Sequence, residues 1–204
     1  MPSPGSTSAD SSGTSAGCRS GCLFIVSAPS GAGKTTLCNA LRGRIADLAY
    51  SVSYTTRPAR RGEQQGREYH FISIDDFEQG IADGRWAEWA RVHGHYYGSS
   101  AQWIDGTLKT GADILMDIDV QGARQILARF PSAITIFIMP PCFEELERRL
   151  RARGTDDAGS VALRLANARQ EIEQKTLYRH VVINDDLEQA VAELVRIVRH
   201  HQVS

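Results

Sequence analysis

The sequence lacks long hydrophobic runs and carries almost no net charge. No apolar stretch approaches the ~18–20 residues that a membrane-spanning helix needs. The N-terminus has no charged segment leading into an apolar one, so we expect neither a membrane partner nor a secretory signal. Because 23 Lys and Arg nearly balance 24 Asp and Glu, the formal net charge is −1, and bulk charge gives no indication of nucleic-acid binding.

Cysteine is also scarce. The four cysteines, Cys18, Cys22, Cys38 and Cys142, do not have the paired spacing of metal ligands. We therefore expect reduced thiols and a cytoplasmic location. With 204 residues, of which 42% are hydrophobic, the chain is long enough for one domain with a buried core.

Changes in composition divide the chain into parts. Residues 1–20 are rich in Ser, Gly, Thr, Ala and Pro, which predicts a disordered tail. Residues 21–204 alternate predicted strands with predicted helices, which favours an α/β fold with a parallel sheet and helices on both faces. Residues 51–99 interrupt this alternation and predict a small mixed-β insertion, which leaves 21–50 and 100–204 as the core.

Apolar runs, breakers and helical periodicity predict the individual elements. Strands are expected at about residues 21–28, in the segment that starts at 51, and at 69–72, 86–90, 96–99, 113–119, 133–139 and 181–184. Helices are expected from about residue 34 to 45 and at 100–110, 120–129, 143–153, 160–178 and 187–199. A short helix should open at Ile74 with an aspartate as its cap. Leu187, Val191, Leu194 and Val198 form the apolar stripe of the last helix.

One stretch between the first strand and the first helix resembles a phosphate-binding loop. It is close to the pattern G-x-x-x-x-G-K-[ST], with alanine in place of the first glycine. Glycines at these positions let backbone N–H groups surround a phosphate, and the positive end of the following helix favours the same anion. The lysine adds a full charge, and the threonine hydroxyl can bind Mg²⁺. The candidate ATP-binding residues are Ala28, Pro29, Ser30, Gly31, Ala32, Gly33, Lys34, Thr35 and Thr36. A tight glycine turn without a ligand is the alternative.

Two aspartates follow the apolar strand at 113–119. Ligands bind at the carboxyl ends of strands in sheets of this kind, so Asp117 and Asp119 are expected to face one crevice. A phosphate-loop enzyme needs a carboxylate there to hold Mg²⁺, directly or through water. The alternative is that these aspartates only cap the helix that begins at Val120.

Arginines cluster in two places. Arg57 and Arg60 lie close together in a proline-containing loop, where they can clamp a phosphate. Arg153 and Arg164 flank a polar break, an arrangement that suits a lid at about residues 153–165 that closes over a transferring phosphoryl group and excludes water. Surface salt bridges are the alternative for each arginine.

Taken in order, these motifs make the chain similar to guanylate kinases over roughly residue 21 to the C-terminus. The matching stretches are residues 27–37 and 51–60, Gly62 and Glu63 with Gly66 and Tyr69, 88–90, Gly94 with 96–99, 117–122, 149–150 with 153–155, and 182–186. The serine-rich tail lies outside the resemblance.

The resemblance implies transfer of the γ-phosphoryl group of ATP to GMP with Mg²⁺, and residues 51–99 as the GMP-binding part. It places Arg57, Arg60, Tyr69 and Tyr97 on the GMP phosphate, and Ser53, Glu88 and Ser99 around the guanine, with Asp117 or Asp119 nearby. It assigns catalysis to Lys34, Arg60, Arg153 and Arg164, and places Arg149 and Asn184 on the ATP side. Thr35 and Asp117 are the expected metal residues.

Residue chemistry agrees with a guanine site. Guanine presents N–H donors at N1 and N2 to a carboxylate such as Glu88, whereas adenine has an acceptor at N1 and would leave the carboxylate unpaired. Two alternatives remain. One is a binding module of this fold without catalysis, against which Lys34, Thr35, Arg153 and Arg164 all argue. The other is a kinase for another phosphate acceptor, against which Ser53 with Glu88 argues. The sequence makes no prediction about oligomers.

Overall fold

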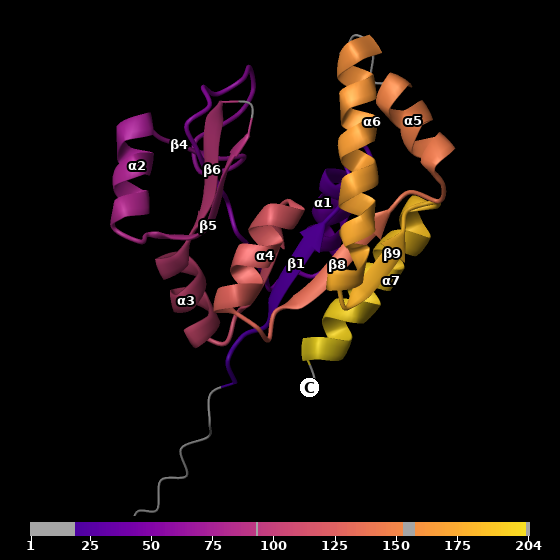
Figure 1. The fold of residues 1–204 in the computed structure, drawn as a ribbon. Helices are drawn as coiled ribbons and strands as arrows, with labels where there is room; N and C mark the ends of the chain where they lie inside the picture. The colour runs from indigo at the N-terminus through magenta and orange to yellow at the C-terminus, as the bar shows by residue number, and fades with distance from the viewer. Residues whose placement is uncertain (1–18, 93, 153–157, 203–204) are drawn as a thin grey trace, which may run out of the picture.

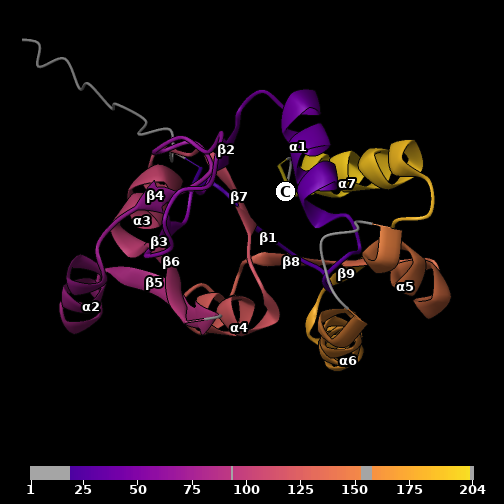
Figure 2. The same cartoon turned by 90° about the horizontal axis from the view of Figure 1, so that it is seen from above.

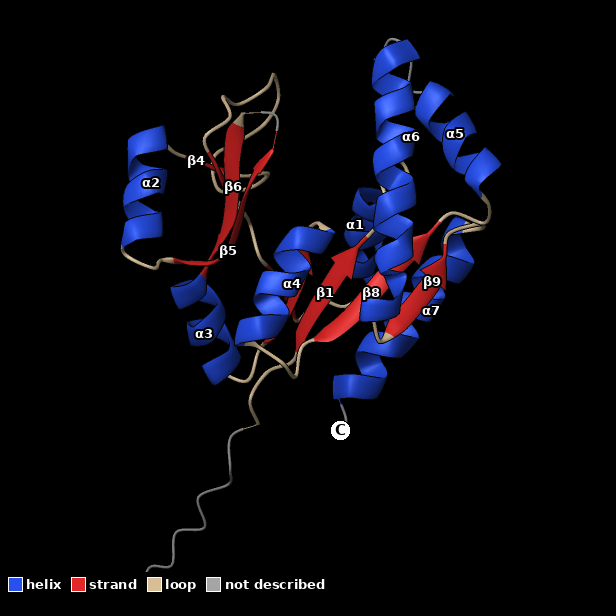
Figure 3. Ribbon diagram, in the orientation of Figure 1, coloured by secondary structure: helices blue, strands red, loops and turns tan. Residues whose placement is uncertain are grey.

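The computed structural model describes residues 19–92, 94–152 and 158–202, which form a large parallel sheet and a small mixed sheet with helices around them (Figures 1 and 3). Of the expected tail, only Arg19 and Ser20 belong to the described residues. Among the described residues, no helix combines the length and the apolar character needed to cross a bilayer.

The large sheet has five parallel strands in the order β2-β7-β1-β8-β9. Their bounds are β1 (Leu23–Ser27), β2 (Leu48–Tyr50), β7 (Asp113–Asp117), β8 (Ile134–Met139) and β9 (His180–Ile183). The parallel α/β architecture expected from the alternation of strands and helices is confirmed. The sequence missed β2, because three residues at a sheet edge are too few to show a period.

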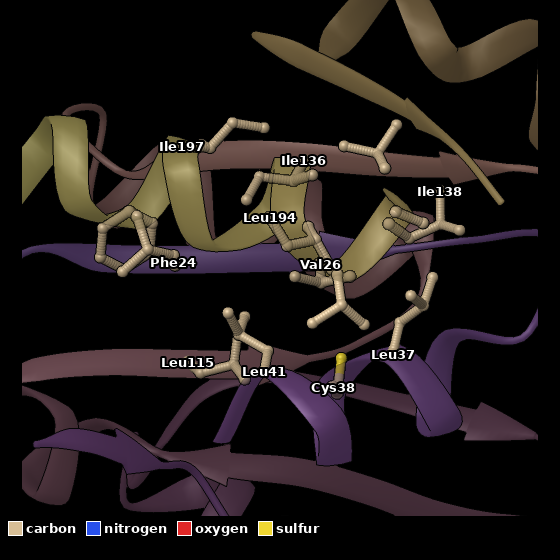
Figure 4. Close-up of a cluster of buried hydrophobic side chains, with 14 of the residues drawn as sticks. Phe24, Val26, Leu37, Cys38, Leu41, Leu115, Ile136, Ile138, Leu194 and Ile197 are labelled. Carbon is tan, nitrogen blue, oxygen red and sulfur yellow. The ribbon is translucent and has the colours of Figure 1, made fainter. Parts of the chain in front are cut away.

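Helices cover both faces of this sheet (Figure 2). The helices α1 (Lys34–Arg44) and α7 (Leu187–Gln202) lie on one face, and α3 (Ala101–Lys109) and α4 (Val120–Arg129) lie on the other. Alternate residues of β1 serve the two sides: Phe24 and Val26 pack with α1 and α7, as Figure 4 shows, whereas Leu23 and Ile25 pack with α3 and α4. Because β1 is buried on both faces, its sequence is a nearly continuous apolar run.

The small sheet stands beside the large one and has the order β4-β3-β6-β5. Its strands are β3 (Tyr54–Thr55), β4 (His70–Phe71), β5 (Trp86–Val92) and β6 (His95–Ser100). The pair β3–β4 is parallel and the other pairs are antiparallel, so the expected mixed-β insertion is present. The helix α2 (Ile74–Ala82) covers it through Phe77, whose ring stacks at 4.5 Å on Trp86 and at 5.1 Å on Tyr96.

A pair of helices stands at the carboxyl end of β8 and β9 (Figure 1). These are α5 (Phe143–Ala152) and α6 (Ala158–Glu173), joined by the small apolar cluster of Leu146, Leu150 and Ala168. The helix expected at 160–178 begins two residues earlier and ends in a 3₁₀ turn, Gln174–Leu177. Most of the expected polar break, together with Arg153, lies outside the described residues.

Two local expectations were wrong. The cap of α2 is Ser73, whose hydroxyl oxygen accepts the Asp76 N–H at 3.0 Å, and the aspartates lie inside the first turn. There their charge favours the helix N-terminus without capping it. In the last helix, Val191, Leu194 and Val198 are buried as expected, but Leu187 at its first turn is 41% exposed.

Candidate active site

The phosphate loop lies between β1 and α1, at the carboxyl end of the large sheet. Gly31 and Gly33 have φ of 95° and 93°, the left-handed region that favours glycine. A side chain at position 33 would also meet Asn184, because its Cβ would lie 2.4 Å from Asn184 Nδ2. Asn184 is buried and donates to the Ala32 carbonyl at 2.7 Å, so the strand-end asparagine supports the loop directly.

Lys34 begins α1 and reaches across to the end of β7. Its ammonium group pairs with the Asp117 carboxylate and donates to the Ile118 carbonyl at 3.3 Å. Burial disfavours the charge, but the Asp117 carboxylate, together with Cys38 and Asp119, outweighs burial and raises the pKa of Lys34 above its ordinary value. The loop therefore presents a charged lysine beside a strand-end carboxylate.

A cavity of about 300 Å³ opens between the phosphate loop and the small sheet. It brings together residues that are far apart in the sequence. The lining residues are Lys34, Thr35, Tyr50, Ser53, Glu68, Tyr69, Glu88, Ala90, Val92, Tyr97, Asp117, Ile118 and Asp119. The three expected residues Arg57, Arg60 and Ser99 are not among them. The cavity thus joins two predicted donor residues, Lys34 and Thr35, with six of the predicted acceptor residues.

Glu88 is the most unusual carboxyl group of this cavity. It lies on β5, is 6% exposed, and accepts a hydrogen bond from Ser99 Oγ at 2.7 Å. Burial, only partly offset by the Ser99 bond, raises the pKa of Glu88 to about 7. Gly122 in the first turn of α4 makes room for it, since a Cβ there would lie 2.7 Å from Glu88 Oε2. Ser99 therefore acts on the cavity through Glu88.

Of the two expected phosphate-binding arginines of the insertion, Arg57 has a side-chain partner in the protein. Arg57 forms a two-pronged pair with Glu63, with its Nη atoms 3.0 and 2.9 Å from the two carboxylate oxygens. Glu63 also accepts the backbone N–H of Arg60 at 2.7 Å, and Arg57 holds the pKa of Glu63 below its usual range. The guanidinium of Arg57 lies 5.4 Å from the ring centre of Tyr69, which itself packs edge-on against Tyr97 at 5.8 Å.

Asp119 fits both roles considered for the strand-end aspartates, a residue of the site and a helix cap. Its carboxylate caps α4 by accepting the Gly122 N–H at 2.7 Å, and it also lines the cavity. Asp117 lines the same cavity beside Lys34. For Asp119, capping a helix and lining the site are therefore compatible.

A second cavity of about 440 Å³ lies on the other side of the phosphate loop. It contains the expected residues Arg149 and Asn184. Arg149 donates to the Asn184 carbonyl at 3.0 Å and pairs with Glu145 at 2.7 Å, so α5 is tied to the end of β9. The remaining lining residues are Gly31, Gly33, Thr36, Arg148, Ala152, Asp185 and Leu187.

Arg164 reaches the loop from α6, where its Nε and Nη2 lie 3.1 and 2.7 Å from Ser30 Oγ. The other expected arginine of the lid, Arg153, lies outside the described residues.

Some site residues were missed by sequence reasoning. Glu63 belongs to a matching motif but was not predicted as a site residue, although it orients Arg57. Tyr50 and Glu68 line the cavity, but Tyr50 belongs to the missed strand β2 and Glu68 has no motif of its own.

The donor chemistry for a metal is a hydroxyl with a carboxylate. Thr35 and Asp117 both line the main cavity, and Mg²⁺ binds through one or two carboxylates together with substrate phosphates and water. Within the described ranges, no three His, Cys, Asp or Glu side chains cluster as an all-protein metal site. The residues present fit a metal that is held jointly with a nucleotide.

A parallel sheet with this loop after its central strand defines a P-loop nucleotide-binding protein. The family model for guanylate kinase matches residues 20–201. A guanylate kinase of Syntrophotalea carbinolica is 48% identical over 180 residues, covering 88% of this chain and 86% of the relative. One of Chromobacterium violaceum is 51% identical over 179 residues, covering 88% and 85%. The crystal structure of guanylate kinase from Anaplasma phagocytophilum aligns with a TM-score of 0.74 at 30% identity, covering 91% of this chain and 88% of that one. The chain belongs to the guanylate kinase family and is an enzyme.

Proposed function

We propose that this enzyme transfers the γ-phosphoryl group of ATP to GMP, giving ADP and GDP. The observation that carries this proposal is a single cavity with the phosphate-loop Lys34 at one side and the buried carboxyl group of Glu88 at the other. Lys34 binds the phosphates of the donor, ATP. Glu88 accepts from guanine N1–H and N2–H, which adenine cannot offer.

The acceptor site is built on the insertion, residues 51–99. Ser53, Glu88 and Ser99 surround the guanine, with Asp117 and Asp119 nearby, and Arg57, Arg60, Tyr69 and Tyr97 take the phosphate. Support comes from the lining of the main cavity and from the Ser99–Glu88 bond, which holds the carboxyl group in place. The Arg57–Glu63 pair leaves further guanidinium N–H groups for a phosphate.

The donor site is built on the core, residues 21–50 and 100–204. Residues 28–36 hold the phosphates of ATP, and Arg149 and Asn184 lie on its base side. The second cavity, which joins the outer side of the loop to both residues, supports this placement. Thr35 and Asp117, the latter directly or through water, would hold Mg²⁺, which supplies positive charge to the donor phosphates.

A lid at about residues 153–165 closes over the bound ATP. Arg153 and Arg164 stabilise the charge of the transferring phosphoryl group, and the closed lid keeps water from accepting it. The contact between Arg164 and Ser30 supports this role, since it shows that α6 reaches the phosphate loop. A cytoplasmic location agrees with these substrates.

A coupled assay of ADP formation with GMP, AMP, UMP and dTMP tests the proposal. We expect turnover with GMP at least a hundredfold faster than with the other acceptors. Lys34→Ala, which removes the charge of the loop, should lower that turnover by at least a thousandfold. Equal rates with AMP would contradict the guanine site, and near-normal turnover of Lys34→Ala would contradict the donor site.

A further inference from the structure

Ser30 in the phosphate loop is held by two side chains of α6. Arg164 contacts its hydroxyl oxygen at 3.1 and 2.7 Å. Glu171 accepts its backbone N–H at 3.3 Å. The two residues are seven positions apart, about two helical turns, and so project from one side of the helix. Two turns of α6 therefore each contribute a side chain that bonds to Ser30.

The phosphate loop also packs against α5. A Cβ at Gly31 would lie 2.8 Å from Leu150 and 3.1 Å from Leu146, so the loop backbone is in close contact with the apolar side of that helix. Both leucines share a cluster with Ala168 of α6. The position of α6 relative to the loop is thus fixed by two kinds of contact. Its Ala168 packs against Leu146 and Leu150 of α5, and its Arg164 and Glu171 bond to Ser30.

The Glu171 carboxylate beside the phosphate loop requires an explanation, because such a loop binds anions and a carboxylate is itself an anion. Burial raises the pKa of Glu171, the Ser30 N–H lowers it, Asp119 raises it and Lys34 lowers it. Glu171 is therefore close enough to interact electrostatically with Lys34 and Asp119, two of the charged groups that line the main cavity. A carboxylate so near to bound phosphates weakens their binding through repulsion. The bond to Ser30 is the benefit that the structure shows for it.

We propose that Glu171 is a positioning residue for phosphoryl transfer: it fixes the Ser30 backbone against α6 and so sets the place of Arg164 over the phosphate loop. This inference rests on the proposed function. Glu171 acts through Ser30 and Arg164 and not by contact with a substrate. Removing its side chain leaves the Ser30 N–H without this acceptor, and the contacts of α6 with that residue then come from Arg164.

The test compares Glu171→Ala with Glu171→Gln, whose amide oxygen can still accept the Ser30 N–H. Glu173→Ala, an exposed glutamate on the same helix, is the matched control. We expect Glu171→Ala to lower kcat about tenfold with KM for GMP unchanged, because the guanine residues lie on another element. Glu171→Gln should stay within threefold of the unaltered enzyme, and Glu173→Ala within twofold.

A double-mutant cycle separates positioning from general support. If Glu171 acts through Arg164, Glu171→Ala should cost less than twofold in kcat when Arg164 is already alanine. A full tenfold loss in that background, or a loss caused equally by Glu171→Gln, would overturn the proposal.

Hydrogen exchange of the Ser30 amide gives a readout without turnover. We expect at least tenfold faster exchange in Glu171→Ala and nearly unchanged exchange in Glu171→Gln and Glu173→Ala. Failure of the unaltered enzyme to phosphorylate GMP would refute the proposed function alone. Unchanged exchange in Glu171→Ala would refute the role of Glu171 whatever the activity.

Discussion

At the scale of single residues, Glu88 shows how burial changes the chemistry of one carboxyl group. Its pKa is raised from 4.5 to about 7, chiefly by burial. The folded protein therefore binds a proton at this site between these values, where the unfolded chain does not. Stability from this group falls as pH rises through that window and is constant above it. The penalty at pH 8 is roughly 3–4 kcal/mol, at about 1.4 kcal/mol per pKa unit.

Glu88→Gln should remove this pH dependence. The neutral amide can still accept from Ser99, so we expect the variant to be the more stable protein at pH 8 and to lose that advantage towards pH 5. Denaturant unfolding at pH 5, 6, 7 and 8 measures the difference. The control is Glu144→Gln, an exposed residue in the first turn of α5. Parallel stability curves for Glu88→Gln and the unaltered protein would contradict a raised pKa.

At the scale of elements, α4 is attached to the edge of the small sheet by one amide side chain. Gln125 of α4 accepts the backbone N–H of Trp89 at 3.1 Å and donates to its carbonyl at 2.8 Å. Trp89 lies on β5, the edge strand of that sheet, next to Glu88. The amide thus pairs with the strand as a neighbouring strand would. It ties the small sheet to α4 directly beside Glu88.

Gln125→Ala should therefore weaken acceptor binding more than donor binding. We expect KM for GMP to rise about three- to tenfold, because the two lost hydrogen bonds, of about 1 kcal/mol each, support β5 and only part of that energy is passed on to acceptor binding. KM for ATP should change less than twofold. Steady-state kinetics with each substrate varied measures both. Gln102→Ala, an exposed glutamine on α3, is the control. A rise in both KM values by the same factor would show that Gln125 supports the whole fold and not the acceptor site.

The elements also show what could be predicted from the sequence. The helix at Val120–Arg129 was predicted with its bounds, because Asp119 and Pro131 mark its ends and its apolar face is periodic. The strand β2 was missed because its three residues depend on β7 for pairing. Much of the main cavity, from Lys34 to Glu88 and Asp119, could be expected from motifs, whereas Tyr50 and Glu68 could not. The Glu63–Arg57 pair, the Gln125 tie and the Glu171–Ser30 bond could not, because each joins side chains to partners that only the fold selects.

At the scale of the whole molecule, the first described residue joins the end of the last helix to the sheet. Arg19 pairs with Asp113 at the start of β7 at 2.5 Å and donates to the Gln202 carbonyl at the end of α7. Asp113 is 5% exposed and also accepts from the Cys22 N–H at 2.7 Å and from Gln202 Nε2 at 2.8 Å. Three segments distant in sequence are therefore held by one buried carboxylate.

Two truncations that differ by one residue test this junction. A protein lacking residues 1–18 retains Arg19, so we expect its Tm and its turnover to match those of the full chain. A protein lacking residues 1–19 leaves Asp113 without its cation, which should cost about 1–2 kcal/mol and lower Tm by roughly 2–8 °C for a chain of this size. Its turnover at 25 °C should be unchanged, because no residue of the junction lines either cavity of the site. Calorimetry and the coupled assay measure the two quantities. A large loss of Tm already in the first truncation would show that residues 1–18 contribute to the fold, and equal Tm values in both would show that the Arg19 pair is too exposed to matter.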